Sequence, residues 1–354
     1  MVRMLPLCCS FLLAFIAFVA SPAGARPVEA EDLFKLSFLS GATISHDGSQ
    51  VAYVVTKLDG VKNTYLSNIW IADVASGKTW QLTRGDSDDS PNWSPDDKWI
   101  AFDSGRGDKG QIYRIALGGG EAQRLTDLPN GASGPTWSHD GTRILFQATT
   151  IDKPAAAHID FSAAGFTPTA DQRTSDVRII TVQHYEDNGA GFTYTQHAHI
   201  WVMAADGTNP HALTSGHSYS ENNAAWSPDD KWIAFDAFYG PDPYGYRGDV
   251  YVMPATGGAP HRVQLAAAGN GFAAWAHDGS GIYYFQTREP DPSNYPALDF
   301  AKVDGSGQRE LVGEDKVAWG DAVITDTTNG GAGCGPIFDP HDSWFLAAVS
   351  TPGA

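Results

Sequence analysis

Serine and histidine are the residue types from which a hydrolytic site would be built, and the chain shows neither in a catalytic pattern. A nucleophilic serine is commonly exposed on a sharp strand-to-helix turn with the sequence G-x-S-x-G. The nearest string, Gly216 to Ser220, has serine at the second glycine position and precedes no helical pattern. The glycine-rich segment Gly330 to Gly335 is followed by no helix start, which argues against an oxyanion or phosphate loop. We therefore predict no catalytic residue.

Histidines and acidic residues could bind a metal instead. His197 and His199 stand two residues apart, which places them on one face of a strand as a zinc pair would need, with His184 not far away. No cysteine or carboxylate lies beside them at ligand spacing, so we favour ordinary strand residues. Two acidic clusters do not match the twelve-residue calcium loop, namely Asp86, Asp88 and Asp89, and Asp242 with Asp249. We predict no metal and no cofactor.

The first 25 residues are typical of an export signal. Arg3 precedes an uncharged apolar run from Leu5 to Ala20, and small residues follow before Arg26. A membrane anchor is the alternative, although the apolar run barely spans a bilayer. Cleavage would leave Cys334 alone, which excludes an internal disulfide, and no partner histidine can be assigned to a catalytic thiol. We predict an exported protein, periplasmic or extracellular, with no membrane attachment after cleavage.

Charge and composition narrow the class of protein further. Asp and Glu number 41 against 23 Lys and Arg, a formal net charge of −18. Such a surface repels phosphate backbones, so we predict no nucleic-acid partner. Hydrophobic residues make up 42% of the chain, with 11 Trp, 13 Tyr and 17 Phe, which is enough for a packed core.

A repeat organises the chain. Residues Trp93 to Asp103 and Trp226 to Asp236 are identical over eleven positions. Looser copies follow the same frame at Ser45 to Gly48, Trp137 to Gly141, Trp275 to Gly279 and Asp339 to Asp342. Three of the five successive spacings are 44 or 49 residues, the others being 89 and 63. Four-stranded propeller blades have periods of roughly 40 to 50 residues.

Each copy has the chemistry of a turn between two strands. Serine and proline open the turn, Asp can bond the backbone two residues on, and Gly or Asp tolerates the left-handed residue that ends it. Apolar strands such as Trp99 to Phe102 follow, then a glycine turn and a Leu-Thr step such as Leu82 and Thr83. One position accepts either Pro or His, which we interpret as a requirement on backbone geometry; it holds Pro95, Pro228, His46, His139, His277 and His341.

These patterns predict an all-β fold, a β-propeller of four-stranded blades over residues 26–354, with Trp93 and Trp226 buried at equivalent places. The ring should be incomplete at the C-terminus, because only Trp344 to Val349 remains to form a strand after the last turn. For the 89-residue interval we favour an insertion at about residues 150–198 over a degenerate blade. The insertion should contain a hairpin that pairs Val177 to Tyr185 with Phe192 to Thr195.

The order of these motifs resembles the N-terminal propeller of the prolyl oligopeptidase family, in the branch of acylaminoacyl peptidases and bacterial dipeptidyl peptidases. The resemblance covers roughly residues 28 to 320. It is carried by Glu31 to Leu36, Ser45 to Gly48, Gln81 to Thr83, Trp93 to Phe102, Gly118 to Thr126 and Asp176 to Arg178. It implies a propeller that caps an α/β-hydrolase domain with a Ser-Asp-His triad and admits only small peptides. That hydrolase domain is absent from this sequence.

Two classes of function follow. The first is the non-catalytic lid of an exported peptidase, which acts on peptide substrate through a separate or missing hydrolase domain. The second is a stand-alone propeller resembling TolB, which shares several motifs and would bind a protein or glycan partner. In either case open strand edges would allow self-association.

Overall fold

The computed structural model describes residues 27, 29–151, 185–187, 191–217, 219–239, 248–263, 269–288, 295–314, 316–319, 336–347 and 349–350. The predicted export signal (residues 1–25), Asp176 to Arg178, Asp242 and the segment Gly330 to Gly335 with Cys334 lie outside these ranges. Among the described residues, no helix has the length and apolar character needed to cross a membrane.

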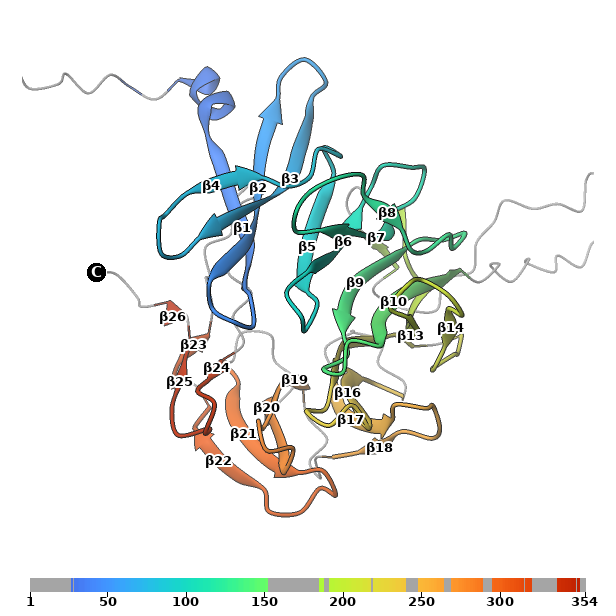
Figure 1. Cartoon of the computed structure of the whole chain (residues 1–354). Coiled ribbons are helices and arrows are strands. Elements are labelled where there is room, and N and C mark those ends of the chain that lie inside the picture. The colour runs from blue at the N-terminus through green and yellow to red at the C-terminus, as the bar shows by residue number, and fades with distance from the viewer. Residues whose placement is uncertain are drawn as a thin grey trace, which may run out of the picture.

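Five four-stranded antiparallel sheets follow one another around a common centre (Figure 1). The first two blades contain β1 (Ser37–Ile44), β2 (Gln50–Asp59), β3 (Thr64–Asp73) and β4 (Thr79–Gln81), then β5 (Asp88–Trp93), β6 (Trp99–Ser104), β7 (Gln111–Ala116) and β8 (Gln123–Arg124). The third contains β9 (Ala132–Trp137), β10 (Arg143–Ile151), β13 (Gln196–Ala204) and β14 (His211–Ala212). The fourth and fifth contain β15 (Glu221–Trp226), β16 (Trp232–Ala237), β17 (Asp249–Pro254) and β18 (His261–Arg262), then β19 (Gly269–Trp275), β20 (Gly281–Thr287), β21 (Ala297–Lys302) and β22 (Arg309–Val312). The predicted all-β propeller of four-stranded blades is confirmed.

The core lies between blades, because consecutive blades share clusters of buried apolar side chains. Consecutive residues Ile100, Ala101 and Phe102 of β6 are fully buried, so alternation of apolar and polar residues disappears. Ile100 and Phe102 pack with Ile69 of the first blade, while Ala101 packs toward the third. Since neighbouring blades share these clusters, each blade depends on the next for stability.

The turn chemistry expected from the repeat is present. The Ser94 hydroxyl donates to the Asp96 carboxylate at 2.7 Å and accepts from the backbone N–H of Trp99 at 3.0 Å. The hydroxyl and Lys98 lower the pKa of Asp96 to about 2. The last turn residue is left-handed in both versions of the turn, with φ of 55° at Asp97 and 72° at Gly48. The turns therefore follow from local sequence.

Both predicted tryptophans are buried at equivalent places. Trp93 is 3% exposed and Trp226 is 4% exposed. The indole Nε1 of Trp93 donates to the Thr43 carbonyl at 3.1 Å, and that of Trp226 donates to the Thr136 carbonyl at 3.1 Å. Each tryptophan thus ties its blade to the inner strand of the preceding blade.

The innermost strands are the elements that sequence reasoning missed. Strand β5 has the sequence DDSPNW, whereas the next strand of the blade, β6, is far more apolar. A bulge breaks its pairing with β6 between Asp89 and Asn92, and Ser90 is left-handed with φ of 52°. Equivalent bulges contain Gly134 in β9 and Asn223 in β15. These positions can hold polar residues because the inner strands face the centre of the ring.

The long interval between repeats falls inside the third blade. Strand β10 pairs with β13 from Arg143 opposite Ala204 to Ile151 opposite Gln196. The intervening residues therefore enter between the second and third strands of this blade. A short hairpin there joins β11 (Glu186–Asp187) to β12 (Gly191–Phe192), one residue beyond the first strand that the sequence predicted.

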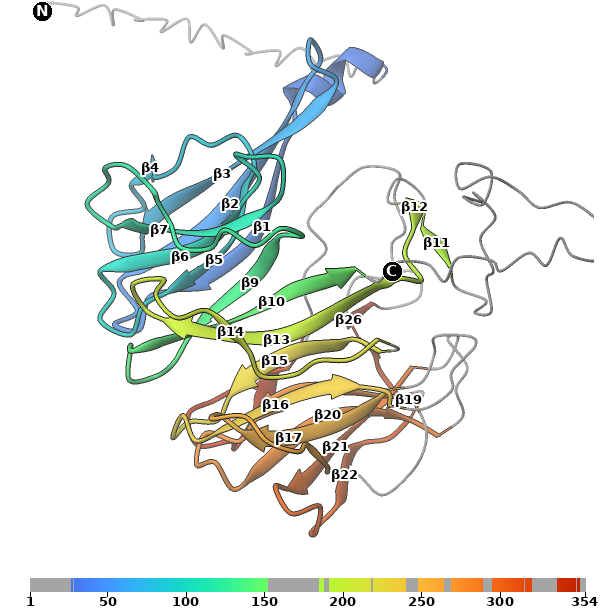
Figure 2. The ribbon, with the colours of Figure 1, turned by 90° about the vertical axis from the view of Figure 1, so that its right-hand side faces the viewer.

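The first blade carries a projecting hairpin. Strands β2 and β3 each have ten residues, against six in β6 and β7. Figure 2 shows this hairpin extending beyond its blade toward the short 3-10 helix η1 (Ala30–Lys35). A Cβ at Gly60 would lie 2.9 Å from the Phe34 ring, so the tip of the hairpin approaches η1 closely.

Four short strands follow the fifth blade. β24 (Ile337–Phe338) pairs with β25 (Phe345–Leu346), and β23 (Ala318–Trp319) pairs with β26 (Val349–Ser350). Phe338 stacks on Tyr283 of the fifth blade with ring centroids 3.8 Å apart. These are two-stranded sheets, so the described residues form no closed ring, as the sequence predicted.

Candidate functional site

A cavity of about 270 Å³ lies where the inner strands of four blades end. Its walls include three indole rings, those of Trp93, Trp137 and Trp226, and the imidazoles of His46 and His139. A second cavity of about 290 Å³ lies between the second and third blades, beside Trp99, Arg114 and Trp137. The lining of the first cavity therefore combines aromatic and hydrogen-bonding residues.

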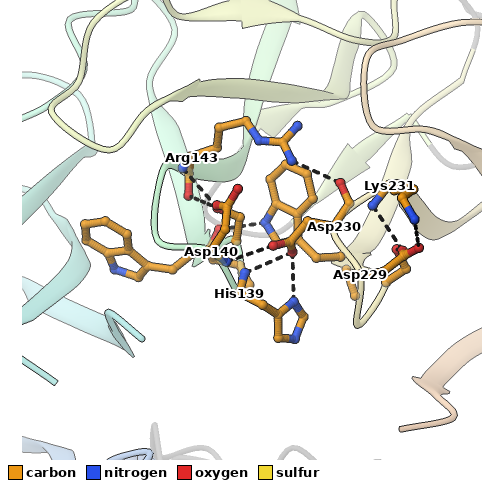
Figure 3. Close-up of polar contacts among 12 residues, drawn as sticks. His139, Asp140, Arg143, Asp229, Asp230 and Lys231 are labelled. Atoms are coloured by element: carbon orange, nitrogen blue, oxygen red, sulfur yellow. Dashed lines mark hydrogen bonds and ion pairs between the residues drawn. The ribbon is translucent and has the colours of Figure 1, made fainter. Parts of the chain in front are cut away.

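Histidine side chains in the turns beside this cavity link neighbouring blades through hydrogen bonds (Figure 3). The Asp230 carboxylate accepts the backbone N–H groups of His139 at 2.9 Å and Asp140 at 2.8 Å. The Nδ1 atom of His139 lies 2.8 Å from the same carboxylate. Because the ionised carboxylate only accepts, Nδ1 carries the proton of this hydrogen bond. The Arg143 guanidinium reaches the Asp230 carbonyl and covers the Trp226 ring at 4.5 Å.

The same contact recurs at two other blade boundaries. His46 Nδ1 lies 3.0 Å from Asp97, and His277 Nδ1 lies 2.9 Å from Asp342. At His46, His139 and His277 this position therefore makes a side-chain contact in addition to the backbone requirement read from the sequence. Sequence reasoning missed the partner because His46 and Asp97 are 51 residues apart. The assignment of His341 to this position is wrong, because Asp339 takes the place of Ser94 in the turn and Pro340 that of Pro95.

Removing the Asp230 carboxylate should destabilise the protein. We choose Asp230→Gly because glycine adopts the left-handed φ of 57° at this position without strain. Two backbone N–H groups lose their acceptor, so we expect the free energy of unfolding to fall by about 1–3 kcal/mol. His139→Ala should cost less than about 1 kcal/mol, because its side chain is 56% exposed. Urea unfolding measures both, and a larger effect at His139 would contradict the assignment.

His199, one of the two histidines weighed as a zinc pair, lies in a buried hydrogen-bond network. His199 Nδ1 lies 2.8 Å from the Glu221 carboxylate and its Nε2 lies 3.1 Å from the Gly216 carbonyl. Thr214 and Tyr239 also donate to Glu221, at 2.9 and 3.0 Å. Burial, then the Glu221 charge, raises the pKa of Tyr239. Within the described ranges, no three His, Cys, Asp or Glu side chains are grouped to hold a metal.

The repeat explains the position of His199. Asn68 and Gln111 precede the equivalent buried isoleucines, and each donates to the loop that leaves its blade, at Asp86 and Leu128 respectively. His199 does the same toward Gly216. This equivalence could have been found in the sequence by aligning the residues that precede the buried isoleucines. It indicates that His199 anchors the loop containing Gly216.

The other sequence candidates have protein partners. Asp88 is fully buried and accepts from Arg106 at 2.8 Å, Ser104 at 2.6 Å and the Gly85 N–H at 2.9 Å. In the string that resembled a nucleophile turn, Ser218 lies outside the described residues. Ser220, at the second glycine position, accepts the Ala198 N–H through Oγ at 3.0 Å. Arg262 pairs with Asp249 at 3.5 Å.

Two carboxyl groups of the identical repeats have raised pKa values. Burial raises the pKa of Asp103 to about 7, with Asp89 adding repulsion, although the Gly134 N–H donates to it at 2.9 Å. Burial likewise raises the pKa of Asp236 to about 6. In each case burial disfavours the charged form of the carboxyl.

The raised pKa of Asp103 predicts a pH-dependent stability. The folded state favours the protonated acid, so this contribution is complete below the unfolded pKa near 3.9 and is lost as pH rises through about 7. Asp103→Asn should therefore stabilise by about 1–2 kcal/mol at pH 8, allowing for solvent screening, and by less at pH 5. Thermal melts at both pH values test this. A greater gain at pH 5 would contradict the sign.

The stacked four-stranded sheets and their shared turn chemistry define a β-propeller. Residues 35–175 match the family model of the TolB β-propeller domain. The chain is 32% identical over 229 residues to an uncharacterized peptidase of Bacillus subtilis, YuxL, covering 64% of this chain and 34% of that protein. It therefore spans about a third of that relative's length.

Solved structures show the same fold at low identity. An uncomplexed acylaminoacyl peptidase of Pyrococcus horikoshii matches with a TM-score of 0.58 and 17% identity, over 79% of this chain and 40% of that one. The propeller domain of the Trilobed protease of Pyrococcus furiosus, described as having an open velcro topology, matches with a TM-score of 0.51 and 16% identity, over 82% and 76%. The predicted resemblance to peptidase propellers is confirmed, and the chain is a propeller related to both peptidase and TolB-like propellers.

Proposed function

We propose that this chain is the non-catalytic propeller portion of an exported prolyl-oligopeptidase-type serine peptidase, in which it gates the entry of small peptides. The observation that carries the proposal is the similarity to the Bacillus peptidase over 229 residues, which are about a third of that protein. A hydrolase domain, in the same polypeptide or a separate one, would supply the nucleophile.

The cavity lined by Trp93, Trp137 and Trp226 gives the proposed gating of peptides a physical basis. Its volume of about 270 Å³ is just below the usual range for ligand sites, roughly 300–1,000 Å³, so it would admit a few side chains of an extended peptide and exclude a folded protein. Indole rings in its wall offer apolar contact that does not depend on peptide sequence. Selection would therefore act on size more than on sequence.

A hybrid enzyme tests this role. The part of the Bacillus relative that matches this chain is replaced by residues 29–354, and chromogenic peptides of increasing length are hydrolysed. We expect kcat/KM to fall steeply with length in the hybrid and to depend little on length in the hydrolase portion alone. Equal dependence on length in both proteins would refute gating.

The chain alone should show no peptidase chemistry. Acyl transfer needs a nucleophile, a base that activates it and donors for the oxyanion. Exposure to a fluorophosphonate probe should label no serine. Stoichiometric labelling of one serine, with turnover of a dipeptidyl substrate that its mutation to Ala abolishes, would overturn the non-catalytic assignment.

The match of residues 35–175 to the TolB propeller domain supports a second candidate, a stand-alone propeller that binds a protein or glycan partner. In that case the hybrid gains no dependence on peptide length. Immobilised chain would instead retain a specific protein or glycan ligand, and Trp137→Ala in the cavity beside the turns would weaken that retention.

A further inference from the structure

Another cavity, of about 350 Å³, lies at the beginning of the fourth blade. It is lined by residues before and within β15 and by the residues that follow β16 and β17. The rings of Tyr219 and Tyr239 form part of its wall, and Glu221 is the one charged residue among the described residues that line it. The other lining residues are uncharged, namely Leu213, Thr214, Ser215, Gly258 and Pro260.

The tyrosine rings of this cavity meet edge to face. The ring centroids of Tyr219 and Tyr239 are 4.5 Å apart, and the two planes make an angle of 75°. Tyr239 in turn lies 4.7 Å from the ring of Tyr251, at an angle of 56°. Aromatic faces carry the negative part of the ring quadrupole and attract cations. Rings set at a steep angle therefore form an electron-rich corner.

The second blade shows what an acid and aromatic rings hold at the equivalent place. The Arg106 guanidinium donates to the buried Asp88 carboxylate at 2.8 Å. The same guanidinium lies over two rings, 5.6 Å from the Phe102 centroid and 5.3 Å from the Tyr113 centroid. In the second blade, a cation of the chain itself is thus held by a carboxylate and by aromatic faces.

The fourth blade repeats this arrangement without the arginine. Glu221 takes the position of Asp88, five residues before the tryptophan of its blade. Phe235 lies opposite Tyr251 in the ladder, which repeats the ring pair of the second blade. Tyr239 takes the position of the arginine, three residues after the repeated eleven-residue segment, and donates to Glu221 at 3.0 Å. At this position the chain therefore supplies an aromatic ring in place of a positive charge.

The hydrogen bonds of Glu221 narrow the kind of cation that the cavity suits. The carboxylate already accepts from His199 at 2.8 Å, from Thr214 at 2.9 Å and from Tyr239. A primary ammonium or a guanidinium brings several N–H donors, and burying them without acceptors costs free energy. A quaternary ammonium has no N–H group, so ring faces alone can hold its charge. The rings, rather than the carboxylate, provide the attraction.

We propose that this cavity binds a soluble organic cation through a quaternary ammonium group, held against the faces of Tyr219 and Tyr239. Its volume lies within the usual range for ligand sites, roughly 300–1,000 Å³. The net charge of −18 attracts cations toward the protein. No residue lines both this cavity and the one assigned to gating, so the site is independent of the proposed peptidase role.

The surroundings favour a soluble compound over a lipid that carries the same group. Among the described residues, none of the exposed large apolar side chains lines the cavity. A lipid headgroup bound here would therefore bring the membrane against a surface that offers it no apolar contact.

Two probes of the same shape test whether the charge is recognised. Choline is titrated into residues 26–354 in a calorimeter, beside 3,3-dimethylbutan-1-ol, in which carbon replaces the charged nitrogen. We expect choline to bind at one site and the neutral alcohol to bind at least about tenfold more weakly, because it lacks the cation–π attraction. Equal affinities, or no binding of choline at about 10 mM, would overturn the proposal. This comparison needs no variant, so it does not depend on the folding of a substituted chain.

Two further probes test the chemical class of the ligand. Ethanolamine carries a primary ammonium on the same two-carbon alcohol and should bind more weakly than choline, because its N–H donors lack acceptors. Ethanolamine binding as tightly as choline would overturn the choice of a quaternary group. In a sedimentation assay with phosphatidylcholine vesicles, the chain should stay in solution. Its sedimentation with the vesicles would overturn the assignment to a soluble cation.

Substitutions of Tyr219 separate the ring face from simple apolar contact. Tyr219→Phe keeps the ring and loses a hydroxyl that lies 3.5 Å from the Ser215 carbonyl, so the affinity for choline should stay within about threefold. Tyr219→Leu keeps apolar bulk without the ring and should weaken binding by at least about fivefold. Tyr65→Leu, at a tyrosine of the first blade that is 38% exposed, is the control and should leave binding unchanged. Wild-type affinity in Tyr219→Leu would overturn the site.

Discussion

Replacing Trp226 by alanine should lower the free energy of unfolding by about 3–5 kcal/mol, the usual cost of deleting a large buried aromatic side chain. Its ring packs in the cluster that joins the third and fourth blades, and Arg143 covers one ring face. The Thr136 carbonyl also loses its indole donor. The cost therefore combines a cavity with a broken contact between blades. Urea unfolding followed by circular dichroism measures it.

Trp344→Ala is the matched control for this substitution. The Trp344 side chain is 58% exposed in the structure, so its removal should change the free energy of unfolding by less than about 1 kcal/mol. Trp93→Ala should resemble Trp226→Ala, because both indoles donate across a blade boundary. Equal midpoints for wild type and Trp226→Ala would contradict the role assigned to this repeat position.

Glu221→Ala should cost about 3–5 kcal/mol, because it removes one partner of a buried charged network. Glu221 and His199 are 1% and 2% exposed, and Thr214 and Tyr239 donate to the same carboxylate. Without it, the buried His199 imidazole and two half-buried hydroxyl groups lose their acceptor. Thermal and urea unfolding should show the loss, together with faster amide exchange in the loop that His199 anchors.

Two further variants separate burial from charge. Glu221→Gln keeps one acceptor oxygen, so it should lose less than Glu221→Ala. Glu310→Ala removes a carboxylate from an exposed pair with Arg288 and should cost about 0–1 kcal/mol. If Glu221→Ala cost no more than Glu310→Ala, the network would contribute nothing to stability.

The fold could be predicted from sequence where local chemistry determines it. The hydrogen bonds of Ser94 lie within one turn, so the turn geometry of each repeat follows from its local sequence. The inner strands could not be predicted in the same way. Strand β5 is polar and bulged, and its strand conformation comes from pairing with β6 and from packing against other blades.

The contacts between blades were missed for a related reason. Asp230 follows His139 by 91 residues, and the insertion in the third blade separates them further than the repeat period does. Glu221 and His199 are only 22 residues apart, yet their contact depends on how the loop between two blades folds back. The spacing of His197 and His199 identified His199 as a candidate, but only as half of a metal pair. Nothing in the local sequence indicated that the Glu221 carboxylate would be its partner.

The nine-pair ladder of β10 and β13 has a consequence for how this protein tolerates change in length. The two strands stay paired up to Ile151 and Gln196, where the inserted residues leave and re-enter the blade. Those ends are fixed by backbone hydrogen bonds, whatever chain runs between them. Closing a longer loop costs only about 0.6 kcal/mol for each doubling of its length. A reporter domain grafted between these two ends should therefore place little strain on the neighbouring blades.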